Sequence, residues 1–179
     1  MITIMEKEGI DRAIARIASE AVEHNDGVQD LVIIGIRTRG VIVARRLQEA
    51  IAKQEGVLLP VGILDIALQR DDLLSGTCRA VFKGSEIDFD VNGKNVILCD
   101  DVMYTGRTIR AAISALNGMG RAKNIRLYTL VDRGHRELPF RADGTGKNVP
   151  TSSREKIVVH FKETDGKEGV YLLKENETL

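Results

Sequence analysis

The sequence predicts an α/β fold with a mostly parallel central sheet, helices on both of its faces and a small antiparallel portion. Short apolar runs at 31–36, 96–99 and 125–131 have the length and composition of buried strands. The first two are followed by a polar turn and then by apolar residues at helical spacing. Strands that alternate with helices in this way form parallel sheets. The 179 residues are expected to make a single domain, residues 1–179.

The first half of the chain is expected to contain two helices and two strands. Apolar residues at helical spacing predict a helix over 10–22, which ends at the turn 24–27. After the strand at 31–36, a second helix is expected from about Val41 to Gln54. Val57 to Leu68 alternates as a strand does.

The segment 70–92 lacks the apolar pattern that marks the helices and strands on either side of it. It is polar, contains Gly76 and Gly84 and has no long apolar face. A long excursion of this kind in a compact domain is usually a lid or a disordered loop. We favour a lid that keeps water from the reaction centre.

The second half is expected to continue the alternation. A helix is predicted where apolar residues recur between 109 and 116, and Gly118 and Gly120 break the chain after it. The strand at 125–131 leads into a long polar stretch. Residues 157–161 form an alternating strand, and 169–173 an edge strand after a turn. These terminal strands and the lid are expected to supply the antiparallel portion.

The most informative stretch is Asn95 to Leu116. Asp100 and Asp101 directly follow its apolar run. The loop from Val102 to Thr108 offers backbone N–H groups, hydroxyls and an arginine next to a helix N-terminus, which suits a phosphate. The two carboxylates are suited to accept hydrogen bonds from the hydroxyls of a sugar. A phosphate beside a diol indicates a ribose 5-phosphate ligand.

These turns are compatible with other interpretations. The stretch after 96–99 could be an ordinary strand-to-helix turn capped by acids and threonines. A P-loop nucleotidase is excluded, because no G-x-x-x-x-G-K-[ST] sequence occurs. The turn 37–40 would bring Arg37 and Arg39 to the carboxyl edge of the sheet, and Gly40 would let the backbone approach a ligand. Taken alone, that turn is equally compatible with a plain surface turn.

Composition narrows the class of protein. The net charge is zero, so the overall charge does not call for nucleic acid or a membrane. Cys78 and Cys99 are too few for a disulfide framework, and the three histidines lack the spacing of a zinc site. No signal peptide is expected, and the sequence has no apolar run near the length of a membrane span. We expect a soluble, cytoplasmic protein.

The stretch 95–116 resembles the phosphoribosyl pyrophosphate (PRPP) signature of type I phosphoribosyltransferases: four apolar residues, two acids and a Thr-Gly-x-Thr loop. Three further segments narrow the resemblance: IRTRG at 36–40, VDRGHRELPFRAD at 131–143 and GKNVPTS at 146–152. With them the chain is similar to the PyrR family from Ile10 to about Tyr171. The PRPP loop alone indicates the superfamily, and the DRGHRELP segment selects the family.

The resemblance implies a type I phosphoribosyltransferase fold and two activities. Members of the family regulate transcription attenuation of bacterial pyrimidine operons and also act as uracil phosphoribosyltransferases. The expected reaction converts uracil and PRPP to UMP and pyrophosphate, with Mg²⁺ held mainly by PRPP rather than by a set of protein ligands. The expected regulation is binding to pyrimidine operon leader mRNA in response to uridine nucleotides such as UMP and UTP. Self-association as a homodimer or higher oligomer is also implied.

The resemblance assigns roles to individual residues. The expected catalytic residues are Asp100, Asp101 and Arg39. The PRPP-binding positions are Thr38, Arg39, Asp100, Asp101, Val102, Met103, Tyr104, Thr105, Gly106, Arg107 and Thr108. Arg133 and Ile157 fall on positions that line the base pocket, where Ile157 would act through its backbone. A structural ion pair is the alternative role for Arg133.

Arg16, Arg136 and Arg141 match the RNA-binding positions of the family. Two neighbouring positions depart from its pattern: Ala15 stands where Thr is usual, and Ser19 where His is usual. Phosphate contacts by the arginines could still bind RNA, whereas recognition of loop bases needs the hydrogen bonds and stacking that these changes reduce. Solvated surface arginines are the alternative for Arg136 and Arg141.

Three functional hypotheses follow. The chain is an enzyme and RNA-binding regulator together, which we favour. The second possibility is an enzyme whose RNA binding has eroded, which Ala15 and Ser19 would favour. The third is a phosphoribosyltransferase for another base, against which the DRGHRELP segment argues.

Overall fold

The structure, a computed structural model, describes residues 1–67, 84–175 and 177. The helices and strands of this part of the chain are, in order, β1 (Ile2–Met5), α1 (Lys7–His24), β2 (Leu31–Ile36), α2 (Arg39–Glu55), β3 (Val61–Leu64), β4 (Asn95–Met103), α3 (Arg107–Met119), β5 (Asn124–Asp132), β6 (Gly144–Asn148), β7 (Glu155–His160), α4 (Lys162–Asp165) and β8 (Gly169–Lys174).

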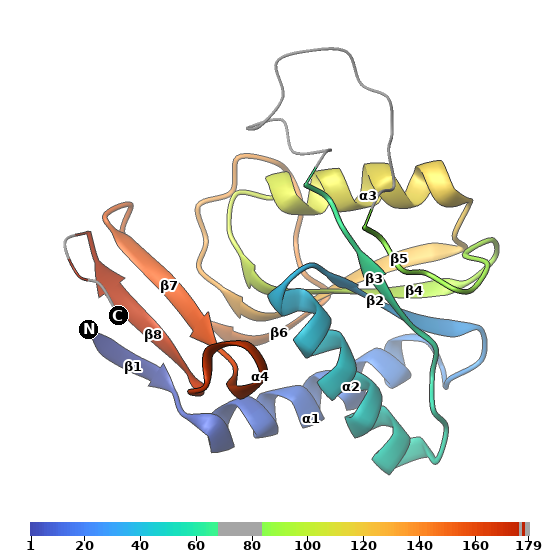
Figure 1. Ribbon diagram of the computed structural model, residues 1–179, viewed down its shortest axis with the longest axis horizontal. Coiled ribbons are helices and arrows are strands. Elements are labelled where there is room, and N and C mark those ends of the chain that lie inside the picture. Colours follow the sequence, from blue (N-terminus) through green and yellow to red (C-terminus); the bar gives the residue numbers. More distant parts are fainter. Residues whose placement is uncertain (68–83, 176, 178–179) are drawn as a thin grey trace.

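The central sheet lies between helices (Figure 1). Its strand order is β3-β2-β4-β5-β6, and all pairs are parallel. Along β2, Leu31 and Ile33 pack in the apolar cluster formed with α1 and α2. Val32, Ile34 and Ile36 pack in a second cluster formed with α3, on the opposite face. A strand buried on both faces needs apolar residues at every position, which is why this segment is a continuous apolar run.

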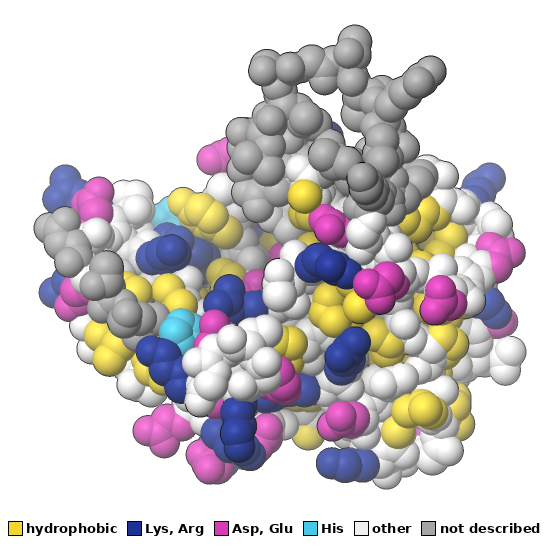
Figure 2. Space-filling view, in the orientation of Figure 1, with side chains coloured by type: hydrophobic (Ala, Val, Ile, Leu, Met, Phe, Trp, Pro, Cys, Tyr) yellow, Lys and Arg dark blue, Asp and Glu magenta, His cyan; other side chains and the backbone are white. Residues whose placement is uncertain are grey.

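A smaller antiparallel sheet, called here the hood sheet, consists of β1, β8 and β7 in that order. It stands beside the central sheet, and α4, which connects β7 to β8, lies against α2 (Figure 1). Arg46 of α2 forms ion pairs with Glu163 and Glu168 and lies over the ring of Phe161. Figure 2 shows basic and acidic side chains interspersed over this side of the molecule. These contacts fix the hood sheet next to the carboxyl edge of the central sheet.

The predicted parallel sheet and its flanking helices are confirmed, with several corrections. The strand predicted over 57–68 is confined to Val61–Leu64, and Leu58 is exposed. The segment 169–173 was predicted as an edge strand, but β8 lies in the middle of the hood sheet, because β1, which was not predicted, pairs with its other side. β6 was also missed, since its sequence GTGKN has two glycines, no apolar residue and no strand pattern.

The predicted lid is only partly within the described residues. Residues 70–83 lie outside them. In the described remainder, Glu86 forms a single antiparallel bridge with Ile63 of β3, and Ile87 and Phe89 pack against the α3-side cluster. The lid therefore stays a prediction. The antiparallel sheet that the structure shows comes from the strands near both ends of the chain.

Candidate active site

The two predicted carboxylates lie at the carboxyl end of β4. β4 extends to Met103, because its pairing with β5 continues as far as Met103 and Asp132, so Asp100 and Asp101 belong to the strand rather than following it. The chain then turns within three residues, 104–106, into α3. Gly106 has φ of 94°, which permits the sharp change of direction.

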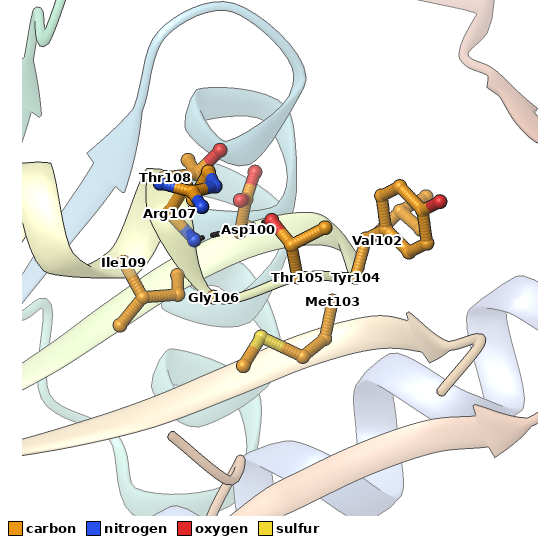
Figure 3. Close-up of a pocket in the computed structure, with 9 residues that line it drawn as sticks. All are labelled: Asp100, Val102, Met103, Tyr104, Thr105, Gly106, Arg107, Thr108 and Ile109. Atoms are coloured by element: carbon orange, nitrogen blue, oxygen red, sulfur yellow. Dashed lines mark hydrogen bonds between the residues drawn. The ribbon is translucent and has the colours of Figure 1, made fainter. Parts of the chain in front are cut away.

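A cavity of about 230 Å³ lies over this turn, lined by Asp100 and by 102–109 (Figure 3). In this view Asp100, Arg107 and Thr108 gather on one side of the loop, whereas Ile109 points away from them. The backbone N–H of Arg107 donates to Thr105 Oγ1 at 3.3 Å. The loop thus brings together the hydroxyls, the cation and the helix N-terminus that a phosphate group needs.

A neighbouring pocket of about 520 Å³ joins this loop to the turn before α2. It shares Asp100, Val102 and Thr108 with the first cavity and adds Asp101 from β4. The end of β2 and the turn after it add Ile36, Arg37, Thr38 and Arg39 to the lining. The residues that follow β3 add 65–67. The structure therefore places Thr38 and Arg39, which were predicted to bind PRPP, on one continuous surface with the loop 102–108, the predicted phosphate loop.

Asp101 is a half-buried carboxyl in this surface. Burial raises its pKa above the usual 3.8, and Asp100 and the positive charge of Arg39 oppose part of the rise. Asp100 is itself buried, and its Oδ1 accepts the backbone N–H of Asp101 at 2.9 Å. The pair can accept hydrogen bonds from a diol, provided that both groups are ionised.

Arg39 is the first residue of α2, two positions earlier than the predicted helix start. Its Nη2 donates to Asp165 Oδ1 of α4 at 2.7 Å. The peptide bond between Arg37 and Thr38 is cis. Arg37 pairs with Glu86 at 3.0 Å, which connects the turn to the start of the second described segment.

Gly40 was predicted to allow a close approach to a ligand. In the structure its close neighbour is the backbone of β4: a Cβ at this position would lie 2.5 Å from the carbonyl oxygen of Cys99 and 3.1 Å from Cα of Asp100. Gly40 therefore lets α2 pack directly on β4. This packing sets the spacing between Arg39 and Asp101.

Arg133 is a buried side chain between the phosphate loop and the hood sheet. Its guanidinium lies 4.1 Å from the centre of the Tyr104 ring, and its Nη2 donates to the carbonyl oxygen of Glu155 in β7 at 2.6 Å. The side chain of Ile157 is buried in the core. Carbonyl groups of alternate strand residues point the same way, so the carbonyl of Ile157 faces the same free edge of β7 as that of Glu155. This direction suits the predicted backbone contact with a base.

The segment 132–140 packs along the outer side of the phosphate loop. The guanidinium of Arg136 donates to the carbonyl oxygen of Tyr104 at 2.8 Å and to that of Phe140 at 2.9 Å, and it pairs with Asp132. Glu137 accepts from Arg107 Nε at 2.6 Å. Arg136, predicted to bind RNA, is thus engaged within the chain.

The other two predicted RNA-binding arginines lie on the surface. Arg16 pairs with Glu20 at 2.8 Å and donates to the carbonyl oxygen of Gly146 at 2.6 Å. Arg141 is exposed. At the two departures from the family pattern, Ser19 donates to Oε1 of Gln54 at 3.1 Å, and Nε2 of Gln54 donates to the carbonyl oxygen of Ala15 at 3.0 Å.

The described residues contain no cluster of three or more His, Cys, Asp or Glu side chains that could hold a metal ion. Within the same part of the chain, no helix has both the length and the apolar character needed to cross a membrane.

The phosphoribosyl transferase domain family matches residues 3–162. "Bifunctional protein PyrR" of Pelotomaculum thermopropionicum is 53% identical over 174 residues, which cover 97% of this chain and 96% of that protein. The protein of the same name from Clostridioides difficile is 52% identical over 167 residues (93% and 94%), and that from Listeria monocytogenes is 46% identical over 179 residues (98% and 98%).

The chain belongs to the PyrR family. The predicted resemblance is confirmed, and so is the type I phosphoribosyltransferase fold. The hypoxanthine phosphoribosyltransferase of Trypanosoma cruzi superimposes with a TM-score of 0.73 at 16% identity, covering 97% of each chain. A hypoxanthine-guanine phosphoribosyltransferase of Bacillus anthracis gives 0.73 at 19% identity, covering 95% of this chain and 96% of its own. Such distant likeness describes the fold of this PyrR chain and not its substrate.

Two residues of this PyrR site were not found from the sequence. Asp165 lies in the turn that was expected before the strand 169–173, and Glu137 lies in the DRGHRELP segment. The sequence assigned no role to either side chain. Asp165 lies 126 positions after its partner Arg39, and Glu137 lies 30 positions after Arg107. No local pattern connects such pairs, because the packing of the hood sheet and of the segment 132–140 decides them.

Proposed function

We propose that the chain is a uracil phosphoribosyltransferase that also regulates pyrimidine operons by binding their leader mRNA. The observation that carries the enzymatic part is the shared surface on which Asp100, Asp101 and the loop 102–108 meet Thr38 and Arg39. It has a phosphate cradle, diol acceptors and a cation in the order that PRPP requires. Membership of the PyrR family supports uracil as the base and the regulatory role.

In the proposed reaction a nitrogen of uracil forms a bond to C1 of the ribose as the bond from C1 to pyrophosphate breaks, and the proton that this nitrogen loses passes to the pyrophosphate or to water. The loop 102–108 holds the 5-phosphate, and Asp100 and Asp101 fix the ribose hydroxyls. Thr38 and Arg39 receive the negative charge that develops on the departing pyrophosphate. Arg133 and the backbone of Ile157 orient the base. Much of the rate would therefore come from positioning and charge stabilisation.

Mg²⁺ belongs to the same proposal. The oxygen atoms of Asp100 and Asp101 are of the type that Mg²⁺ accepts, and the ion usually retains phosphate oxygens and water among its ligands. We propose that PRPP supplies most of those ligands. The ion would neutralise the diphosphate as it leaves.

For the RNA part we propose a surface that includes Arg16 and Arg141. Arg141 is exposed, and the Arg16 side chain is 49% exposed, so both can reach a phosphate. Arg136 was assigned to the same surface by resemblance. Its contacts with Tyr104 and Asp132 support an indirect part, in which it connects the nucleotide site to the region that carries Arg141. We also propose that the protein is cytoplasmic and that it self-associates, as expected from the family.

The first experiment measures pyrophosphate release from PRPP and Mg²⁺ with uracil, cytosine, hypoxanthine, adenine and orotate in parallel. We expect turnover with uracil. Turnover with hypoxanthine or adenine instead would keep the PRPP site and refute the assigned base. Absence of turnover with all five bases would refute the enzymatic role.

A second candidate is an enzyme with eroded RNA binding. The contacts of Gln54 with Ser19 and Ala15 favour it, because they occupy polar groups at the positions that would face RNA. A gel-shift titration of a pyrimidine leader RNA, with and without UMP, separates the two candidates. Tight, UMP-dependent binding supports the bifunctional protein, and its absence supports the enzyme alone.

A further inference from the structure

We infer that Asp165 is a positioning residue for the transfer reaction, because it holds the guanidinium of Arg39 beside the pyrophosphate side of the pocket. The inference rests on the proposed function and extends it to the hood sheet. Asp165 ends α4, between β7 and β8, whereas Arg39 begins α2 at the edge of the central sheet.

The carboxylate of Asp165 is held by donors from its own element as well as by Arg39. Its Oδ2 accepts the backbone N–H of Phe161 at 2.9 Å and the hydroxyl of Thr164 at 2.8 Å. Its Oδ1 accepts Arg39 Nη2 at 2.7 Å. The Asp165 side chain is only 15% exposed, compared with 38% for Arg39. A half-buried carboxylate with several donors thus holds one end of a more exposed cation.

This ion pair is not needed to attach α4 to α2. Arg46 already joins α2 to α4 through Glu163, at 2.8 Å, and it also pairs with Glu168 just after α4 and lies over Phe161 just before it. The pair of Asp165 with Arg39 lies nearer to the pocket, which Arg39 lines together with Thr38 and Asp101. Its specific effect is therefore to orient a cation of the site.

Orientation matters because an arginine side chain has many rotamers. A guanidinium that is already held loses less conformational freedom when the pyrophosphate group binds, and it is in place when negative charge develops on the leaving group. Asp165 does not touch the substrate. Its loss should reduce the rate of the chemical step and leave the base pocket unchanged.

The test compares uracil-dependent turnover of the wild-type protein with that of Asp165→Asn, Asp165→Glu and Glu163→Gln. Asn keeps an oxygen for Phe161 and Thr164 but loses the charge that holds Arg39. We expect kcat to fall about tenfold in Asp165→Asn, while KM for uracil changes less than about twofold. Asp165→Glu should recover part of kcat. Glu163→Gln removes a carboxylate from the same short helix, and it should keep the wild-type kcat.

A double-mutant cycle with Arg39→Ala shows whether Asp165 acts through Arg39. The Asp165→Asn change should then cause less than about a twofold further loss, because its partner is already absent. Independent, multiplicative losses would overturn the inference, as would an unchanged kcat in Asp165→Asn. Equal loss in Glu163→Gln would assign the effect to docking of α4. If the wild-type protein itself shows no turnover, the proposed function fails first, and the inference with it.

Discussion

Asp101 shows how burial and function oppose each other at a single residue. A carboxyl that accepts hydrogen bonds from ribose hydroxyls must be ionised, but burial raises the pKa of Asp101. The positive charge of Arg39 opposes this rise. Under the proposed function, Arg39 would therefore support the ribose site as well as the pyrophosphate side.

Asp101→Ala should abolish turnover with uracil, because the ribose loses one of the two carboxylates that are proposed to fix its hydroxyls. Steady-state kinetics measures the loss, and thermal unfolding of the variant checks that it folds. Near-normal activity would refute the assignment of Asp101 to the ribose.

The raised pKa of Asp101 also predicts a pH dependence. As the pH falls, Asp101 takes up a proton at a higher pH than an exposed Asp would. Once protonated, its side chain is uncharged like that of asparagine, so the wild-type protein should no longer bind UMP more tightly than Asp101→Asn does. The ratio of UMP affinities of the wild-type protein and Asp101→Asn should approach one on acidification, starting above pH 4. Calorimetric titrations at several pH values measure it. A ratio that is constant with pH would contradict the prediction.

The pKa of Asp165 is shifted in the opposite direction from that of Asp101. Burial disfavours its charge, but the N–H of Phe161 and the Arg39 guanidinium outweigh burial and lower its pKa to about 2. Because the pKa in the folded state lies below that in the unfolded chain, ionised Asp165 stabilises the fold above about pH 4, and this contribution is lost as the pH falls toward 2. Urea unfolding of Asp165→Asn should show a loss of about 1–2 kcal/mol at pH 7. The difference from the wild-type protein should shrink below pH 4; a difference of the same size at pH 3 would contradict it.

At the scale of elements, the phosphate loop depends on the segment that covers it. The backbone N–H groups of Glu137 and Leu138 donate to the carbonyl oxygen of Thr105 at 2.9 and 3.0 Å. A Cβ on Gly106 would lie 3.3 Å from both Leu138 Cβ and the ring of Phe140. The segment 132–140 thus shapes the loop through hydrogen bonds as well as through packing.

Gly106→Ala should therefore raise KM for PRPP at least severalfold and destabilise the protein by about 1 kcal/mol, because alanine disfavours a positive φ. Gly27→Ala is a matched control: Gly27 has φ of 112°, with no atom within 4 Å of the added Cβ, and it is remote from the pocket. We expect similar destabilisation there, measured by thermal unfolding, but an unchanged KM. Equal KM values for the two variants would contradict a special role for the loop.

At the scale of the whole molecule, the site exists because two sheets meet. The central sheet provides Asp100 and Asp101 and leads into the loop 102–108, the hood sheet provides Ile157, and α4, between two strands of the hood sheet, provides Asp165. Arg46 connects them with a side chain that is 16% exposed, opposite Glu168, which is 9% exposed. Removing one partner of such a pair leaves the other charge buried.

Arg46→Ala should destabilise the protein by about 3 kcal/mol, measured by urea unfolding. Lys7→Ala removes the exposed pair with Asp11 and should leave the unfolding midpoint unchanged. A small effect of Arg46→Ala would mean that apolar contacts alone fix the hood sheet.

The sequence by itself determined the strand–turn–helix units and the parallel central sheet, and it singled out the loop 102–108 as the proposed phosphate site. These features depend on neighbours in the chain: the apolar runs at 31–36 and 96–99, and the acids and glycine that follow Cys99. Only the tertiary structure decided the ion pair of Arg39 with Asp165, the engagement of Arg136 with Tyr104 and the central place of β8 in the hood sheet. The physical reason is separation along the chain, because such contacts are fixed by how sheets and helices pack and leave no periodic signal in the sequence.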